Sequence, residues 1–162
     1  MKVAILTIYF LLFGAMAVQA QELKAFSDNT FSRFGKWGFK DQNGKVIVEP
    51  KYDSFGEFSE GLAWVKTGGT YDEEYEMFFG GKVGFINNTG KEAIGLKYES
   101  AKSFTEGLAA VKVNGRWGYI NKIGEEIIPF LYSEAFIFVN GKASVKKDGV
   151  TLYIDKTGKE IK

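Results

Sequence analysis

One motif recurs along this chain, and the recurrence constrains the fold more than any other feature. Three full copies and one shorter copy follow one another, at residues 35–66, 81–112, 115–146 and 148–162. From the second copy onward the period is regular, because Phe85, Tyr119 and Tyr153 are each separated by 34 residues. A repeat of this length is one supersecondary unit that buries its apolar face only against its neighbours. The sequence therefore predicts an array of stacked units.

Each copy is predicted to contain antiparallel strands joined by tight turns. Four short segments begin with an Asp or Asn residue and end with a glycine, and these glycines are Gly44, Gly90, Gly124 and Gly158. An Asx side chain accepts a hydrogen bond from the backbone two residues on, and glycine takes the left-handed conformation that closes such a turn. We therefore expect four β-hairpins.

A second turn and a third strand complete each full copy. The second turns are expected at 60–61, 106–107 and 140–141, and small apolar residues two positions apart follow each of them. Pro50 and Pro129 are expected to mark the ends of the strands that contain their neighbours, because proline cannot donate to a sheet. The segment 54–61 is left open between a short helical turn and irregular chain.

A tryptophan followed directly by a glycine begins two of the copies, at Trp37-Gly38 and Trp117-Gly118. In the middle copy Val83 replaces the tryptophan, whereas Gly84 is kept. Glycine weakens a strand and often marks a close approach of other backbone. We therefore expect the aromatic residues to fill the core between units and the glycine to admit neighbouring backbone or an aromatic ring.

The predicted fold class is all-β, an array of stacked antiparallel hairpins or three-stranded units over residues 21–162. Residues 67–80 form an insertion between the first two copies. A closed propeller is less favoured, because a propeller blade carries four strands and three units and a fraction are too few for a ring.

The first 20 residues are predicted to be a signal peptide rather than part of the domain. Lys2 precedes an apolar run, and small residues at Val18 and Ala20 favour cleavage before Gln21. A retained membrane anchor is the alternative, although the apolar run is short for a membrane span. No cysteine follows the run, so no acylated lipoprotein is expected. The expected location is periplasmic or secreted.

The aligned copies resemble the WG-repeat family, also described as KWG repeats. KWGFKD together with YDSFGEFSEGLAWV is similar to the family's unit, and RWGYIN with EEIIPF is similar to its start. The middle copy departs from the family pattern at Val83, and the third copy has FVNGKA where the family has a Phe-Ser-Glu-Gly-Leu segment. The resemblance covers nearly all of residues 21–162. It implies an all-β repeat fold, common in exported bacterial proteins, with no shared activity or catalytic residues.

Composition excludes several kinds of chemistry. The chain has no histidine and no cysteine, so it lacks the usual general base, thiol nucleophiles and zinc ligand sets. Acidic and basic side chains balance, with 20 acidic and 21 basic residues, which argues against nucleic acid as a partner. A carboxylate pair for glycoside hydrolysis stays possible, but Glu60 and Glu106 recur at the same repeat position and are interpreted as turn residues. No cofactor, metal or membrane insertion after signal cleavage is expected.

The insertion is the non-repeated part of the chain and supplies the candidate binding residues. These are Tyr71, Asp72, Tyr75, Phe78 and Phe79, together with Trp64, which precedes the insertion. Insertions in repeat arrays often lie on the functional face, and tyrosine is a common contact residue. The alternatives are an extended hairpin with a solvated acidic tip, and a Trp64 that packs under the insertion.

The function hypothesis from the sequence is a secreted, non-enzymatic binding or scaffold module at the bacterial cell envelope or outside the cell, with a protein or glycan partner. Two alternatives stay open. One is a glycan- or peptidoglycan-active enzyme with an unrecognised carboxylate pair, and the other is a purely structural spacer.

Overall fold

The computed structural model describes residues 23–28, 35–75 and 77–161. The predicted signal segment 1–20 and its cleavage site before Gln21 lie outside these residues. Within the described ranges every helix or strand is a β-strand, which confirms the all-β class.

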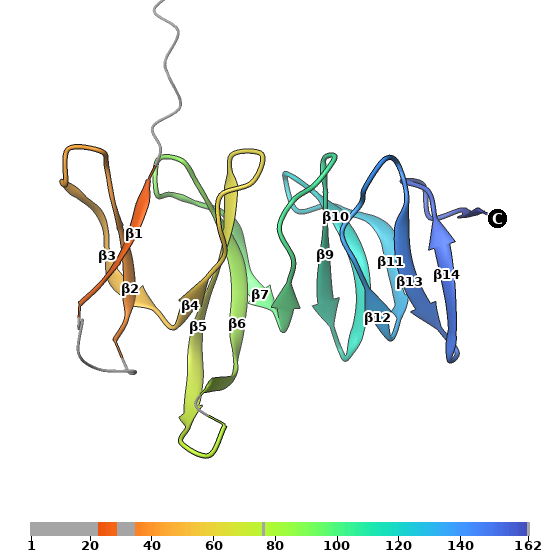
Figure 1. Cartoon of the computed structure of the whole chain (residues 1–162), viewed down its shortest axis with the longest axis horizontal. Coiled ribbons are helices and arrows are strands. Elements are labelled where there is room, and N and C mark those ends of the chain that lie inside the picture. The colour runs from red at the N-terminus through yellow and green to blue at the C-terminus, as the bar shows by residue number, and fades with distance from the viewer. Residues whose placement is uncertain (1–22, 29–34, 76, 162) are drawn as a thin grey trace, which may run out of the picture.

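The strands form four antiparallel sheets, which follow one another in chain order along the long axis of the molecule (Figure 1). Sheet 1 has the order β1-β2-β3, with β1 (Lys24–Ser27), β2 (Trp37–Lys40) and β3 (Val46–Tyr52). Sheet 2 has the order β4-β5-β6-β7, with β4 (Ser54–Phe55), β5 (Leu62–Asp72), β6 (Met77–Asn87) and β7 (Glu92–Tyr98). Sheet 3 has the order β11-β10-β9-β8, with β8 (Ser100–Ala101), β9 (Leu108–Val113), β10 (Arg116–Asn121) and β11 (Glu126–Tyr132). Sheet 4 has the order β12-β13-β14-β15, with β12 (Glu134–Ala135), β13 (Ala143–Lys147), β14 (Val150–Ile154) and β15 (Glu160–Ile161).

A bend residue carries the chain from each sheet into the next one. β3, β7 and β11 each end one residue before this bend, and the short β4, β8 and β12 begin directly after it. The bend residue donates its N–H to a lysine carbonyl of the next sheet, at 2.8 Å for Asp53 to Lys66, 2.9 Å for Glu99 to Lys112 and 2.8 Å for Ser133 to Lys146. The expectation of three strands per unit is wrong, because each full copy also contains a two-residue strand after the bend. A strand this short has no periodic pattern that would reveal it in the sequence.

The hairpin turns form around their Asx residues. Asp41 accepts hydrogen bonds at Oδ1 from the N–H groups of Asn43 and Lys45, both at 2.9 Å. Gly44, at φ +84°, donates to the Asp41 carbonyl at 3.1 Å. The same pattern of bonds surrounds Asn87, Asn121 and Asp155.

The second turns are two-residue hairpin loops. Ser59 and Leu62 exchange both backbone hydrogen bonds, at 2.9 and 3.0 Å. The central residues Glu60 and Gly61 have φ of +53° and +84°, as a type I′ turn requires. The segment 54–61, which the sequence left open, therefore forms β4, three irregular residues and this turn.

The two prolines lie inside strands, not at their ends. Pro50 is in β3 and Pro129 is in β11, and each strand is the outermost of its sheet. An edge strand can accommodate proline because one side of it has no partner for an N–H group. The prediction that these prolines mark strand ends is therefore wrong.

Pairs of aromatic rings occupy the cores between sheets. The first ring of each pair stands two positions after the repeat tryptophan, or after Val83 in the middle copy. The second ring is a phenylalanine 19 residues further along the chain, in the segment between the first two strands of the next sheet. The centroid distances are 5.9 Å for Phe39–Phe58, 4.9 Å for Phe85–Phe104 and 5.0 Å for Tyr119–Phe138, all edge-to-face. Trp37 and Trp117 are only partly buried and pack at the margin of these clusters. The centre of each core is therefore formed by these pairs and not by the repeat tryptophans.

The repeat glycine is required by a close approach of the neighbouring strand. A Cβ atom on Gly84 would lie 2.5 Å from the Ile94 carbonyl oxygen, and Gly38 and Gly118 have the same constraint at 2.4 and 2.6 Å. Next to each of these glycines the pairing register shifts, as in a β-bulge. In sheet 4 Leu152 takes the glycine position, and the described pairing of β14 with β15 covers only Tyr153 and Ile154.

Candidate functional site

Trp64, Val83 and the insertion, three departures from the repeat pattern, all lie on the β5–β6 hairpin of sheet 2. In sheets 1 and 3 the repeat tryptophan is followed two residues later by an aromatic residue that pairs with a small residue on the preceding strand, as Phe39 with Ala25 and Tyr119 with Ala110. In sheet 2 the sizes are exchanged, because Trp64 takes the small position and Val83 takes the tryptophan position. Val83 keeps the cross-strand partner of the tryptophans, a tyrosine at the end of the long strand.

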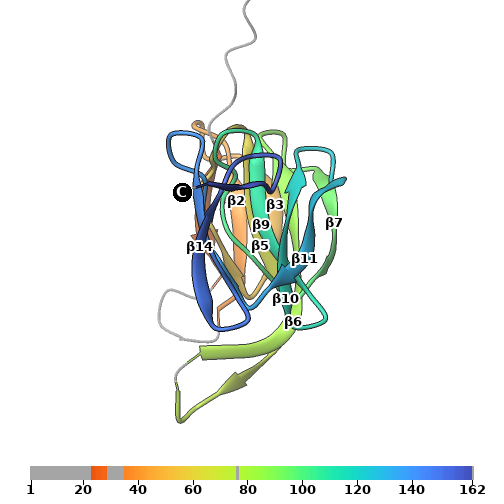
Figure 2. The same cartoon turned by 90° about the vertical axis from the view of Figure 1, so that its right-hand side faces the viewer.

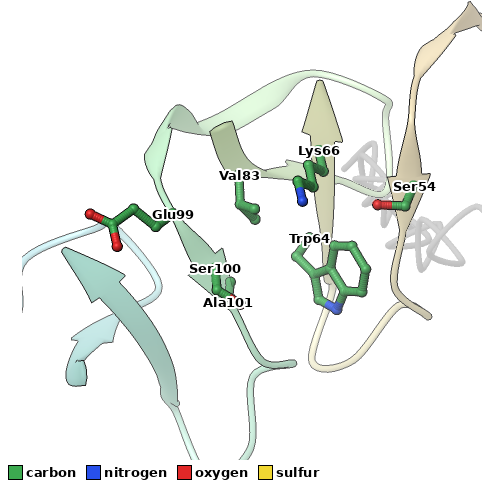
Figure 3. A pocket seen from close by; sticks show the side chains of 7 residues that line it. All are labelled: Ser54, Trp64, Lys66, Val83, Glu99, Ser100 and Ala101. Carbon is green, nitrogen blue, oxygen red and sulfur yellow. The ribbon is translucent and has the colours of Figure 1, made fainter. Parts of the chain in front are cut away.

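This exchange coincides with a hollow between sheets 2 and 3, which we call the Trp64 hollow. Its volume is about 410 Å³, and it is lined by Ser54, Trp64, Lys66, Val83, Glu99, Ser100 and Ala101. Figure 3 shows the indole of Trp64 on one side, with Val83, Ser100 and Ala101 on the other. The hollow thus has one aromatic wall and one wall of small side chains.

The interface between sheets 2 and 3 has two small residues at a pair of positions where the other two interfaces have at least one large aromatic residue. Between sheets 1 and 2, Trp37 packs on Phe55 with ring centroids 5.0 Å apart. The residues at these two positions between sheets 2 and 3 are Val83 and Ala101. Between sheets 3 and 4, Trp117 packs against the core cluster that contains Ala135. The Trp64 hollow therefore corresponds to a tryptophan position that the chain does not fill.

Trp64 is held by the connection between β4 and β5. A Cβ atom on Gly56 would lie 2.0 Å from the indole Nε1, so only glycine leaves room for the ring. Gly56 also donates its N–H to the Trp64 carbonyl at 2.9 Å. The corresponding positions in the next two sheets are Lys102 and Phe136, where the small residue replaces tryptophan. Trp64 and Gly56 are therefore matched to each other.

The insertion lengthens the same hairpin. β5 and β6 remain paired as far as Asp72 and Met77, and Figure 2 shows this hairpin projecting beyond the rest of the stack. At its tip, Asp72 accepts hydrogen bonds from the N–H groups of Glu74 and Tyr75, at 2.9 and 3.2 Å. Tyr75 and Phe79 are 62% and 47% exposed, and their rings meet edge-to-face at 5.8 Å. The tip therefore presents an aromatic pair to the solvent.

Tyr71 and Phe78, two further predicted binding residues, lie on the same hairpin. Tyr71 is partly buried, and its backbone pairs with that of Phe78. The side chain of Phe78 lies outside the described part of the structure.

A buried carboxylate anchors the foot of the extended hairpin. The Asp53 side chain is fully buried, accepts a hydrogen bond at Oδ2 from Gly69 at 2.8 Å and pairs with Lys36. One repeat later, Glu99 accepts a hydrogen bond from Gly115 at 3.1 Å. The orientation of the hairpin relative to sheet 2 is thereby fixed next to the Trp64 hollow.

The recurring glutamates bridge neighbouring sheets. Glu60 accepts a hydrogen bond from the Gly107 N–H at 3.0 Å and pairs with Lys122 at 3.0 Å. Glu106 accepts from Gly141 at 3.0 Å in the same way. The hydrogen bond from Lys122 is the main reason that the pKa of Glu60 is lowered. These contacts support the interpretation of both glutamates as turn residues.

The described residues contain neither a cluster of metal-ligating side chains nor a membrane-spanning helix. No three Asp or Glu side chains of residues 23–28, 35–75 and 77–161 come together as metal ligands would. Over the same part of the chain, no helix has the length and apolarity needed to cross a membrane.

Comparison with known proteins identifies the repeat. Residues 37–71, 84–117 and 117–150 match the family described as WG containing repeat. The chain belongs to this family. The first and third matches begin at the tryptophan of a WG pair, whereas the second begins at Gly84 and leaves out Val83. No curated protein and no solved structure matches the chain.

Sequence reasoning singled out Trp64 and Val83 separately but not the hollow between sheets. The signal was present, because the two residues are opposite departures: the first copy has a tryptophan where the other full copies have a small residue, and the second copy has a valine where the other full copies have the tryptophan. Their proximity depends on strand register across the insertion, and Ser54, Ser100 and Ala101 belong to two-residue strands that have no pattern.

Proposed function

We propose that the chain is an exported, non-enzymatic WG-repeat protein that acts as a binding module at the cell envelope or outside the cell. The observation that carries this proposal is the gathering of the non-repeated features on one hairpin. The Trp64 hollow lies at the foot of the β5–β6 hairpin and the exposed rings of Tyr75 and Phe79 lie at its tip. Exposed aromatic side chains of this kind are typical of contact surfaces.

A non-enzymatic role agrees with the side chains that the chain provides. It contains no histidine or cysteine, and the recurring Glu60 and Glu106 already hold the turns of the next sheet. A partner of protein or glycan character is therefore preferred to a substrate that is turned over.

Export is tested on the N-terminus of the protein in the cells that produce it. The intact mass of protein from the periplasm or medium should correspond to a chain that begins at Gln21. A mass that retains residues 1–20 in a membrane fraction would instead support the retained anchor.

Binding is tested with the mature chain immobilised against envelope and secreted fractions of the same cells. Tyr75→Ser with Phe79→Ser should reduce the retained material without changing the melting temperature, because both rings are exposed. Ile123→Ser is a matched control, since Ile123 is 73% exposed on the β10–β11 turn. Equal retention by all three proteins would contradict a binding role for this hairpin.

The enzyme alternative has a separate readout. Turnover of peptidoglycan or another polysaccharide by the purified chain, lost on a single carboxylate substitution, would replace the binding proposal.

A further inference from the structure

We propose that the Trp64 hollow binds an aromatic side chain, in the first place an indole, of a polypeptide partner. This inference rests on the proposed binding function and names the partner class for its site. It assigns a role to the hollow, whereas the tip of the hairpin supplies additional contact surface.

The three interfaces between sheets differ at one repeat position. The repeat position that Val83 occupies is filled by Trp37 between sheets 1 and 2 and by Trp117 between sheets 3 and 4. Both tryptophans stand opposite a tyrosine of the long strand, and Val83 stands opposite Tyr98 in the same register. The architecture around the hollow is therefore one that accepts an indole in its other two occurrences.

The walls of the Trp64 hollow are mostly apolar and aromatic. Val83 and Ala101 supply apolar surface, and the indole of Trp64 supplies an aromatic wall against which another ring can pack edge-to-face or offset. Lys66 lies at the rim, beside Trp64 (Figure 3), where an ammonium group is attracted to an aromatic face. Such a lining suits a ring better than a charged or extended aliphatic group.

The polar groups of the hollow fit a polypeptide better than a sugar. A sugar ring needs several polar side chains directed at its hydroxyl groups, and Glu99 at the rim is already hydrogen-bonded to Gly115 at 3.1 Å. The hydroxyl groups of Ser54 and Ser100 are well suited to the amide groups on either side of an aromatic residue. Ligand sites of this kind are mostly apolar with a few polar groups that fix orientation.

The test uses N-acetyl-L-tryptophanamide as the probe and the isotope-labelled mature chain as the target. Backbone amide resonances of Val83, Ser100 and Ala101 should shift saturably as the probe is added. N-acetyl-L-leucinamide should bind at least roughly fivefold more weakly, because it buries less apolar surface.

Three variants make the result specific to the hollow. Val83→Trp fills it with the residue that the other interfaces carry, and Trp64→Ala with Val83→Trp rebuilds the arrangement of Ala110 and Trp117. Both should lose the response to the probe, and the second keeps the test valid if the first does not fold. Thr151→Trp is the matched control, because residue 151 is the same repeat position in sheet 4 and does not line the hollow. It should respond like the unchanged chain.

The outcomes separate this inference from the proposed function. If the probe causes no saturable shift, or shifts Val83→Trp equally, the hollow is not a site for an aromatic side chain, and retention of partners through the hairpin tip is unaffected by this result. If an N-acetylglucosamine oligomer shifts the same resonances and the probe does not, the site is a glycan site and the inference is overturned. Saturable binding of the probe that both filled variants abolish supports it.

Discussion

Replacement of Phe104 by alanine is expected to weaken the whole array through one interface. Phe104 has no exposed surface and meets Phe85 of the preceding sheet at 4.9 Å. Removal of a fully buried phenylalanine costs about 3–5 kcal/mol, which includes the cavity that remains. A domain of this size has a total stability of roughly 5–15 kcal/mol, so this one change should remove a large part of it.

The measurement is equilibrium unfolding of the mature chain in urea, followed by far-ultraviolet circular dichroism. A double-mutant cycle with Phe85→Ala should give a coupling of about 0.5–1.5 kcal/mol, as expected for an edge-to-face ring pair. Ile123→Ala is the control on an exposed site and should stay within about 0.5 kcal/mol of the unchanged chain. A loss below about 1 kcal/mol for Phe104→Ala, or additive single losses, would refute the claim that ring pairs join the sheets.

Three further changes test local features of the repeat. Gly84→Ala should destabilise the chain by about 1–3 kcal/mol in urea unfolding, because its Cβ would lie 2.5 Å from the Ile94 carbonyl oxygen. Tyr119→Phe should cost about 0.5–1.5 kcal/mol at neutral pH by loss of the hydrogen bond to Phe136. Burial raises the pKa of Tyr119, so the unchanged chain should also lose stability as the pH rises above about 10, and this loss should be smaller in the variant. The pKa of Glu60 is lowered in the folded state, so its contribution is present at neutral pH and is lost as the pH falls through the folded pKa; melting curves of Glu60→Gln should therefore show a weaker loss of stability in acid.

The features that the sequence predicts well are those determined by neighbouring residues. The Asx-to-glycine turns depend on hydrogen bonds within five residues, as around Asp41, and their sequence signal is local. The WG glycine was likewise predicted from its lack of a side chain, and the structure supplies the carbonyl oxygen that approaches Gly84.

The features that the sequence does not reveal depend on long-range register. Phe104 lies 19 residues after its partner Phe85, in an irregular segment without periodicity, so its central place in the core has no local signal. Pro50 was misinterpreted because the position of β3 at a sheet edge is a property of the assembled stack. The Trp64 hollow has the same origin, since it exists only once sheets 2 and 3 are stacked.

Trp64 and Val83 exchange the sizes that sheet 3 has at the corresponding positions, Ala110 and Trp117. The most direct test is the urea-unfolding free energy of Trp64→Ala, Val83→Trp and the double variant. Trp64→Ala alone should lose about 1–3 kcal/mol, because it enlarges the hollow. Addition of Val83→Trp should restore most of this loss, so that the double variant lies within about 1 kcal/mol of the unchanged chain. A double variant that is destabilised by the sum of Trp64→Ala and an overpacking penalty for Val83→Trp would contradict the exchange.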